Sequence, residues 1–205
     1  VERSRGLGDV YKRQVITVSR EPGSGGGLVG KLVAEGLKLD FFHREIIQKI
    51  AESANISNRL LETLDEKGLS VLDDWVSTLV NERHLWPDQY LRHLIRVVGT
   101  IGRHGHAVIV GRGANFLLPP EKAFRVRVVA PLDLRVQNVA ANFGVPVEEA
   151  KRRVLRTESD RSAFVRKYFH ADIDASVNYD LVINTGTLTI EGAAEAIKAA
   201  LKGKK

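Results

Sequence analysis

The spacing of apolar and polar residues along this chain predicts strands that alternate with helices. Residues 15–18, Val-Ile-Thr-Val, form a β-branched run, and beyond a glycine cluster the apolar residues recur every three or four positions up to Leu37. The same reasoning predicts further strands at 107–110, 124–130 and 181–183, and helices at 132–143, 147–159 and 190–201. Such alternation is typical of a parallel sheet that has helices on both faces and right-handed crossovers.

A helical insert is predicted between the first two of these strands. Polar segments with apolar residues three or four positions apart cover 44–54, 58–66, 71–84 and 88–104. Trp75 and Trp86 fall among leucines and valines at helical positions, so we expect them to pack within the insert rather than to stack on a base.

Composition limits the class of protein. The chain has 205 residues, of which 43% are hydrophobic and 27% are charged, and this fits one soluble globular domain. No segment approaches the roughly 18 uninterrupted apolar residues that cross a bilayer, so no membrane partner is expected. The chain has no cysteine, which excludes disulfides and thiolate metal sites and fits the cytoplasm, the location that we expect.

The formal charge of +6 is compatible with nucleic-acid binding or with a pocket for several phosphates. The arginines between Arg152 and Arg166 lie beside Asp160 and form no continuous basic stripe, so nucleic acid is not the favoured partner. Residues 1–14 show no periodicity and the chain has no methionine, so we expect this segment to be non-native or disordered and the domain to span 15–205. The sequence leaves the oligomeric state open.

A glycine-rich loop separates the first strand from the first helix. It reads Ser19-Arg-Glu-Pro-Gly-Ser-Gly-Gly-Gly27, and glycines let the backbone turn so that successive N–H groups point at one anion. The following helix adds the positive end of its dipole. A flexible glycine turn is the alternative. The residues that we predict to bind phosphates are Gly23, Ser24, Gly25, Gly26 and Gly27.

The loop departs from the common G-x-x-x-x-G-K-[ST] motif, because Gly26 and Gly27 stand where the motif has a lysine and a hydroxyl residue. Arg20 could reach the phosphates in place of the lysine, and Ser24 could supply a hydroxyl. An exposed position without a ligand is the alternative for Arg20, since most arginines lie at the surface.

Five segments resemble successive blocks of the cytidylate kinase-like family, in the same order and with similar spacing. They are VITVSREPGSGG, FFHREII, VIVGRGANFLL, RTESDRSAFVRKYF and NYDLVINTGTLTIEGA, which together span nearly all of residues 15–200. The resemblance implies a three-layer α/β/α P-loop NTPase fold with a parallel sheet, a helical insert at 44–104 that binds the nucleoside monophosphate, and a helical lid at 147–172. It also implies transfer of the γ-phosphate of ATP, with Mg²⁺, to a pyrimidine nucleotide such as CMP or dCMP.

Arg112 follows the strand at 107–110, within the segment Gly111-Arg-Gly-Ala-Asn115. Ligands of parallel sheets bind at the carboxyl ends of strands, and a guanidinium can grip a phosphate at two points. In related cytidylate kinases the arginine at the matching position contacts the acceptor nucleotide, so the resemblance implies that Arg112 binds substrate. A structural ion pair is the alternative.

Five arginines lie close together in the predicted lid. Arg152 and Arg156 share a helix face, whereas Arg161 and Arg166 follow a break that we predict near 157–160. Phosphoryl transfer is catalysed largely by positioning and charge neutralisation, so we expect Arg156, Arg161 and Arg166 to be catalytic and Arg152 to bind substrate. A solvated basic face is the alternative.

Asp160 directly precedes Arg161 and matches an acidic residue of the family's lid. The resemblance implies that it is a catalytic residue that orients an arginine or contacts the acceptor. Capping of a helix is an equal alternative, because aspartate is a favoured N-cap residue. We expect Arg161 to reach the transferring phosphoryl group when the lid closes.

No magnesium ligand can be identified from the sequence. The strand at 107–110 ends in Val110 and Gly111 where a P-loop enzyme has an aspartate, and His43 stands where the family block usually carries another. The remaining nearby acids are Glu21, Asp40 and Glu45.

Three functions therefore stay open. The first is an ATP-dependent kinase that acts on a nucleoside monophosphate. The second is a non-catalytic nucleotide-binding or regulatory module, because the lysine and the carboxylates are missing and a fold does not determine a function. The third is a kinase for another small hydroxyl or phosphate substrate.

Overall fold

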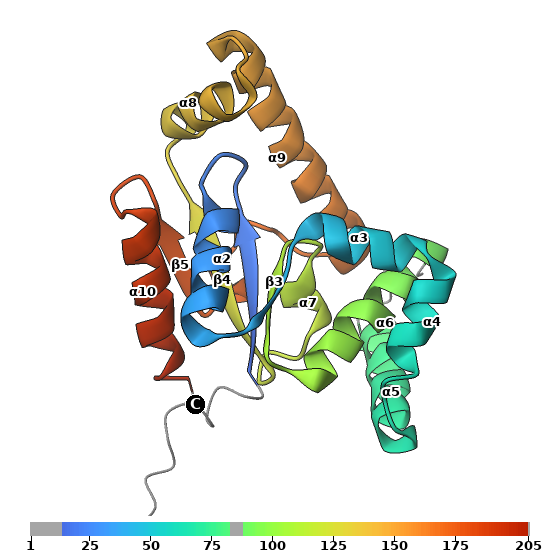
Figure 1. Ribbon diagram of the computed structural model, residues 1–205. Coiled ribbons are helices and arrows are strands. Elements are labelled where there is room, and N and C mark those ends of the chain that lie inside the picture. The colour runs from blue at the N-terminus through green and yellow to red at the C-terminus, as the bar shows by residue number, and fades with distance from the viewer. Residues whose placement is uncertain (1–13, 83–87, 205) are drawn as a thin grey trace, which may run out of the picture.

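Five parallel strands form the sheet in the computed structural model, which describes residues 14–82 and 88–204 (Figure 1). The strands are β1 (Val15–Arg20), β2 (Asp40–Phe42), β3 (Ala107–Val110), β4 (Ala123–Val129) and β5 (Leu181–Asn184), in the order β2-β3-β1-β4-β5. Every neighbouring pair is parallel, so the predicted parallel sheet is confirmed. Strand β2 is missing from the sequence prediction, because a strand of three residues has no periodicity to recognise.

Helices occupy both faces of the sheet and two further regions. Those next to the sheet are α2 (Gly26–Leu37), α6 (Gln89–His104), α7 (Ala114–Leu117) and α10 (Ile190–Leu201). The insert after β2 also contains α3 (Arg44–Glu52), α4 (Ala54–Leu61) and α5 (Glu66–Glu82). The segment after β4 forms α8 (Leu132–Phe143), α9 (Val147–Phe169) and the 3₁₀ helix η1 (Ser176–Asn178). None of the helices in the described ranges is long and apolar enough to cross a membrane.

Successive side chains of β1 point to opposite faces of the sheet, and each face has its own hydrophobic core. Ile16 and Val18 pack with α2 and α10, which lie side by side over one face of the sheet in Figure 1. Val15 points to the opposite face, where its core includes residues of α6 and α7. Helices on both faces of a parallel sheet confirm the three-layer α/β/α P-loop fold.

The insert packs onto this second core through α5 and α6. Leu72 and Leu79 are buried, and the indole Nε1 of Trp75 donates a hydrogen bond of 2.8 Å to the carbonyl of Leu117 in α7. Trp75 therefore packs as predicted. Trp86 and nearly all of the segment 1–14 lie outside the described residues.

Helix α9 is one continuous helix of 23 residues, so the predicted break near 157–160 is wrong. The segment contains threonine, serine and aspartate, which disfavour a helix only mildly, and it has no glycine or proline. Val154 before it and Val165 after it are both buried. Tertiary packing on both sides thus holds the polar segment in the helix.

Candidate active site

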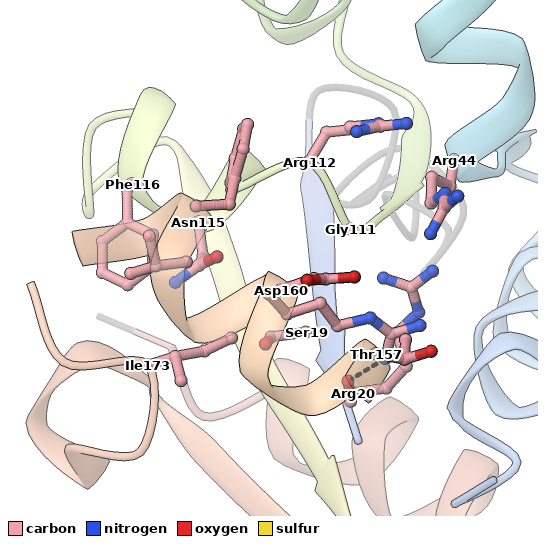
Figure 2. Close-up of a pocket in the computed structure, with 14 residues that line it drawn as sticks. Ser19, Arg20, Arg44, Gly111, Arg112, Asn115, Phe116, Thr157, Asp160 and Ile173 are labelled. Carbon is pink, nitrogen blue, oxygen red and sulfur yellow. Dashed lines mark hydrogen bonds between the residues drawn. The ribbon is translucent and has the colours of Figure 1, made fainter. Parts of the chain in front are cut away.

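A cavity of about 360 Å³ opens where β1 and β3 end and α9 passes over them. Its walls are the end of β1, the first turn of α3, the turn from β3 into α7, and the middle of α9. In Figure 2, Arg20, Arg44 and Arg112 lie on one side of this space, and Asn115 and Phe116 lie on the other. The carboxyl ends of parallel strands are the usual ligand site of such folds. This space is termed the central cavity.

The glycine loop begins directly after β1 and leads into α2. Gly23 and Gly25 have φ angles of 82° and 75°, a left-handed backbone that favours glycine. The first bond of the helix runs from the N–H of Val29 to the carbonyl of Gly25 at 3.0 Å. The N–H groups of residues 26–28 therefore have no acceptor among the described residues, and such a helix terminus is suited to an anion.

Neighbouring side chains hold this loop in one shape. Asn138 Nδ2 donates to the carbonyl of Gly23 at 2.8 Å, and Thr185 Oγ1 donates to the carbonyl of Ser24 at 2.7 Å. The hydroxyl of Ser24 donates to the carbonyl of Glu21 at 2.9 Å, and the residue is only 1% exposed. In this structure the hydroxyl of Ser24 closes the turn, and the expectation that it serves a ligand stays a prediction.

Four guanidinium groups line the central cavity, from Arg20, Arg44, Arg112 and Arg161. Arg161 Nη1 donates to the carbonyl of Arg20 at 2.7 Å, which holds Arg161 at the wall of the cavity in this structure. Burial, followed by the charge of Arg161, lowers the pKa of Arg20 to about 9. Burial, followed by the charge of Arg44, lowers the pKa of Arg161 to about 10. An anion bound among these cations would offset their mutual repulsion.

The arginines also keep unused hydrogen-bond donors. The Nε atoms of Arg44, Arg112 and Arg161 are buried and have no hydrogen-bond partner among the described residues. Asp160 is the one carboxylate among the described residues that line the cavity. Buried donors without acceptors are costly, so the cavity is suited to an anion with several oxygens, such as a phosphate.

Arg112 stands in a strained turn. Gly111, Arg112 and Gly113 have φ angles of 84°, 55° and 67°, and a left-handed backbone is uncommon for a residue other than glycine. Arg112 Nη2 donates to Gln48 Oε1 of α3, and Gln48 Nε2 in turn donates to Glu52 Oε1 at 2.6 Å. Because this partner is a neutral amide, the positive charge of Arg112 remains available to a ligand.

The opposite end of the central cavity is apolar. Phe116, Phe164 and Ile173 line it, and Phe116 stacks on Phe169 with ring centroids 5.3 Å apart. Asn115 is buried there, and its Nδ2 atom has no hydrogen-bond partner among the described residues. A cationic end and an aromatic end with one amide match a ligand that has a phosphate and a planar base.

The other predicted residues fall at different places along α9. Asp160 lines the central cavity and also a second cavity of about 380 Å³, which Arg156 and Gly23 line too. Because Asp160 lies in the middle of α9, its alternative role as a helix N-cap is wrong. Arg166 lines a separate cavity near the end of α9, and the exposed Arg152 lines none of the three.

The structure thus does not bring Arg152 and Arg166 together with Arg161, contrary to the prediction of one converging set. The reason is helical periodicity, which turns the chain by about 100° per residue. Nine residues separate Arg152 from Arg161, which places the two side chains on opposite sides of α9. Arg166 follows Arg161 by five positions, about 140° around the helix, and lines a separate cavity. Arg156 precedes Arg161 by the same number of positions, but it shares the second cavity with Arg161.

Sequence reasoning missed several residues of the cavity, among them Arg44 and Ser19. Arg44 is the first residue of α3, and its only signal is its place in the block FFHREII. Ser19 Oγ accepts a hydrogen bond from Arg127 Nη1 at 2.9 Å. Arg127 lies 108 residues further along the chain, so no local pattern links the two.

The hydrogen-bond donors of the site suit the phosphates of ATP, whereas the side chains present are poorly suited to holding a metal ion by themselves. The described residues contain no group of three or more His, Asp or Glu side chains that could hold a metal ion. Glu21 Oε2 already accepts the N–H of Ala130 at 2.8 Å and lies 3.3 Å from Arg135 Nε. Magnesium that binds to phosphate oxygens needs only one or two carboxylates, and Asp160 is the acid that lines the cavity.

Comparisons with solved structures agree with this fold. A crystal structure of a protein from Eubacterium ventriosum has a TM-score of 0.74 at 22% identity, covering 94% of this chain and 99% of that chain. Shikimate kinase from Bacteroides thetaiotaomicron has a TM-score of 0.53 at 15% identity, covering 92% and 98%. At these identities the similarity shows a shared fold.

Comparisons of sequence identify the family. The chain is 29% identical over 188 residues to the cytidylate kinase of Ignicoccus hospitalis, covering 91% of this chain and 98% of that one. It is 28% identical over 187 residues to the cytidylate kinase of Pyrococcus horikoshii, covering 91% and 88%. The sequence profile of the cytidylate kinase-like family matches residues 15–187. The chain therefore belongs to the cytidylate kinase-like family and is an enzyme of the nucleotide kinase class, which confirms the resemblance carried by its five sequence blocks.

Proposed function

We propose that this protein transfers the γ-phosphate of ATP to a nucleoside monophosphate, with CMP or dCMP as the acceptor. The observation that carries the proposal is the convergence of four guanidinium groups on one cavity beside the N-terminus of α2. Two phosphorylated substrates that meet there bring enough negative charge to balance these cations. A neutral hydroxyl substrate would leave part of the positive charge without a partner.

The donor would bind at the glycine loop. The free N–H groups of residues 26–28 and the dipole of α2 suit the phosphate oxygens of ATP. The second cavity adjoins this loop, and Arg156 would neutralise the donor phosphates from there. Mg²⁺, when bound, supplies further charge neutralisation at the phosphates, and Asp160 would be its protein carboxylate.

The acceptor would bind in the central cavity. Arg112 and Arg44 would hold its phosphate, and the apolar end with Phe116 and Phe164 would contact its nucleoside. The choice of cytosine is supported by the names of the relatives, which are cytidylate kinases. Gln48 of α3 would keep the guanidinium of Arg112 in place, and Gln48 is itself held by its hydrogen bond to Glu52.

Catalysis would rest on position and charge. Arg161 lines both cavities and is fixed by its bond to the carbonyl of Arg20, so its guanidinium lies where donor and acceptor would meet. A phosphoryl group in transfer spreads negative charge over its oxygens. A cation that is shielded from water stabilises this charge more strongly than a solvated one.

A coupled ADP-release assay tests the proposal. ATP and Mg²⁺ are supplied with each of CMP, UMP, AMP and GMP and their deoxy forms, and reactions without acceptor measure background hydrolysis. We expect the highest kcat/KM with CMP or dCMP. If calorimetry shows ATP binding but none of the nucleotides is phosphorylated, the protein is a nucleotide-binding module and the proposal is wrong.

A further inference from the structure

Arg20 stands where the common phosphate-binding motif has a glycine. When the pattern G-x-x-x-x-G-K-[ST] is aligned so that Gly25 is its second glycine, Gly26 stands at the lysine. Arg20 then stands at the first glycine of the pattern. The chain therefore has a cation at the start of the motif and lacks the one at its end.

The stem of Arg20 fills the space that a side chain at position 26 would need. A Cβ atom on Gly26 would lie 2.4 Å from Arg20 Cβ and 3.1 Å from Arg20 Cγ. These atoms are close to the backbone and cannot swing aside as the end of a flexible side chain can. At Gly27, in contrast, a Cβ atom would have no neighbour within 4 Å. Arg20 thus excludes a side chain at position 26 but not at position 27, and Val128 Cβ, 3.1 Å from the same point, adds to the exclusion.

The other end of Arg20 lies beside the end of β3. Gly111 follows this strand, and a Cβ atom there would lie 2.3 Å from Arg20 Nη1. The guanidinium thus packs directly on the backbone of Gly111, at the edge of the central cavity. Two glycines, one at each end, make room for the whole side chain of Arg20.

We propose that Arg20, at the end of β1, binds the phosphates that the lysine of the common motif binds from the position of Gly26. We also propose that the side-chain stem of Arg20 requires glycine at position 26. The proposal rests on ATP binding to the loop, as proposed above. A planar guanidinium can bond two phosphate oxygens, so it can serve from the end of β1 the terminal phosphates that a lysine serves from inside the loop.

A reciprocal exchange tests this proposal. Arg20→Gly, Gly26→Lys and the double variant are compared with the parent by calorimetry of ATP binding and by thermal unfolding. Loss of charge-assisted hydrogen bonds should weaken ATP binding by about 10- to 100-fold in Arg20→Gly. Gly26→Lys should lose at least as much, because its stem collides with Arg20. The double variant restores the common motif and should bind ATP at least tenfold more tightly than Arg20→Gly.

Two results would overturn the proposal. One is a folded double variant that binds ATP no better than Arg20→Gly. The other is a Gly26→Lys variant that binds ATP as the parent does. If the double variant does not fold, Arg20→Lys decides: it keeps the charge and should bind ATP more tightly than Arg20→Gly, and equal affinities would refute the role of the cation.

Lys31→Ala provides the matched control, because it removes an exposed cation from α2, where Lys31 pairs with Glu35 at 3.8 Å. ATP affinity should stay within about twofold of the parent, as is usual for a surface ion pair. Binding is measured without any acceptor. A parent that binds ATP but phosphorylates no nucleotide would therefore refute the proposed function and still leave the exchange to decide the role of Arg20.

Discussion

The two halves of α9 carry the same type of side chain in very different surroundings. In the N-terminal half, Val154 packs against α8, and this pair of helices projects beyond the sheet in Figure 1. In the C-terminal half, Val165 and Phe169 belong to the core that α6 and α7 share with the sheet. Arg152 lies exposed in the first half, whereas Arg161 lies in the second and lines two cavities.

The surroundings of an arginine in α9 therefore decide what it can do. A guanidinium at the surface is screened by water and salt, and its interactions are worth little. A buried guanidinium is screened less, so its field on a bound phosphate is stronger. The burial that lowers the pKa of Arg161 to about 10 is the same feature that would make it effective on a phosphoryl group.

The largest effect is expected from Arg161→Ala. Its guanidinium would act on the charge of the transferring group, so kcat should fall on the order of a hundredfold or more, about 3 kcal/mol of transition-state stabilisation, while KM for ATP changes a few-fold. Steady-state kinetics measures both constants. A kcat within about twofold of the parent would show that Arg161 acts on the reaction no more than the exposed arginines of the first half of α9 do.

An anion bound among the four arginines of the central cavity should stabilise the folded protein. Pyrophosphate or ADP at about 100 times its Kd contributes about 2.7 kcal/mol, which raises Tm by roughly 5–10 °C in a chain of this size. At the same ligand concentration the increase should be smaller by about 1–3 °C in Arg161→Ala, because its affinity falls only a few-fold, and unchanged in Arg152→Ala. Differential scanning calorimetry at constant ionic strength checks this, and equal increases in both variants would contradict it.

Arg156→Ala should have an intermediate effect. The residue is exposed, but it lines the cavity beside the glycine loop, so it would attract the donor phosphates through solvent. We expect ATP affinity to fall about three- to tenfold, with little change in kcat and a strong dependence on salt. Calorimetry at two salt concentrations measures this, and a loss of kcat as large as that in Arg161→Ala would place the two arginines in one class.

The smallest effects are expected from Arg152→Ala and Arg166→Ala, which lie on other sides of α9. Their kcat and KM values should stay within about twofold of the parent, and the free energy of unfolding within about 0.5 kcal/mol. A tenfold loss of activity in either variant would restore the predicted set of converging arginines, and it would require a movement of α9 that turns these residues toward the substrates.

Much of the fold could be predicted because its signals are local. The β-branched run at 15–18 and the helical spacing after the glycine loop identify β1 and α2 without any tertiary contact. The break near 157–160 was a wrong prediction for a different reason. Polar residues disfavour a helix only weakly, and the buried Val154 and Val165 outweigh that preference.

The chain's own pattern established the alternating strands and helices, the glycine loop and the family, since each depends on residues that are neighbours in sequence. The makeup of the central cavity depended on the tertiary structure. Arg20, Arg44, Arg112 and Arg161 come from four elements, and only the order of the strands and the path of α9 place them around one space. Their arrangement around one space, which makes them suited to phosphate, arises from contacts between distant segments that no periodicity records.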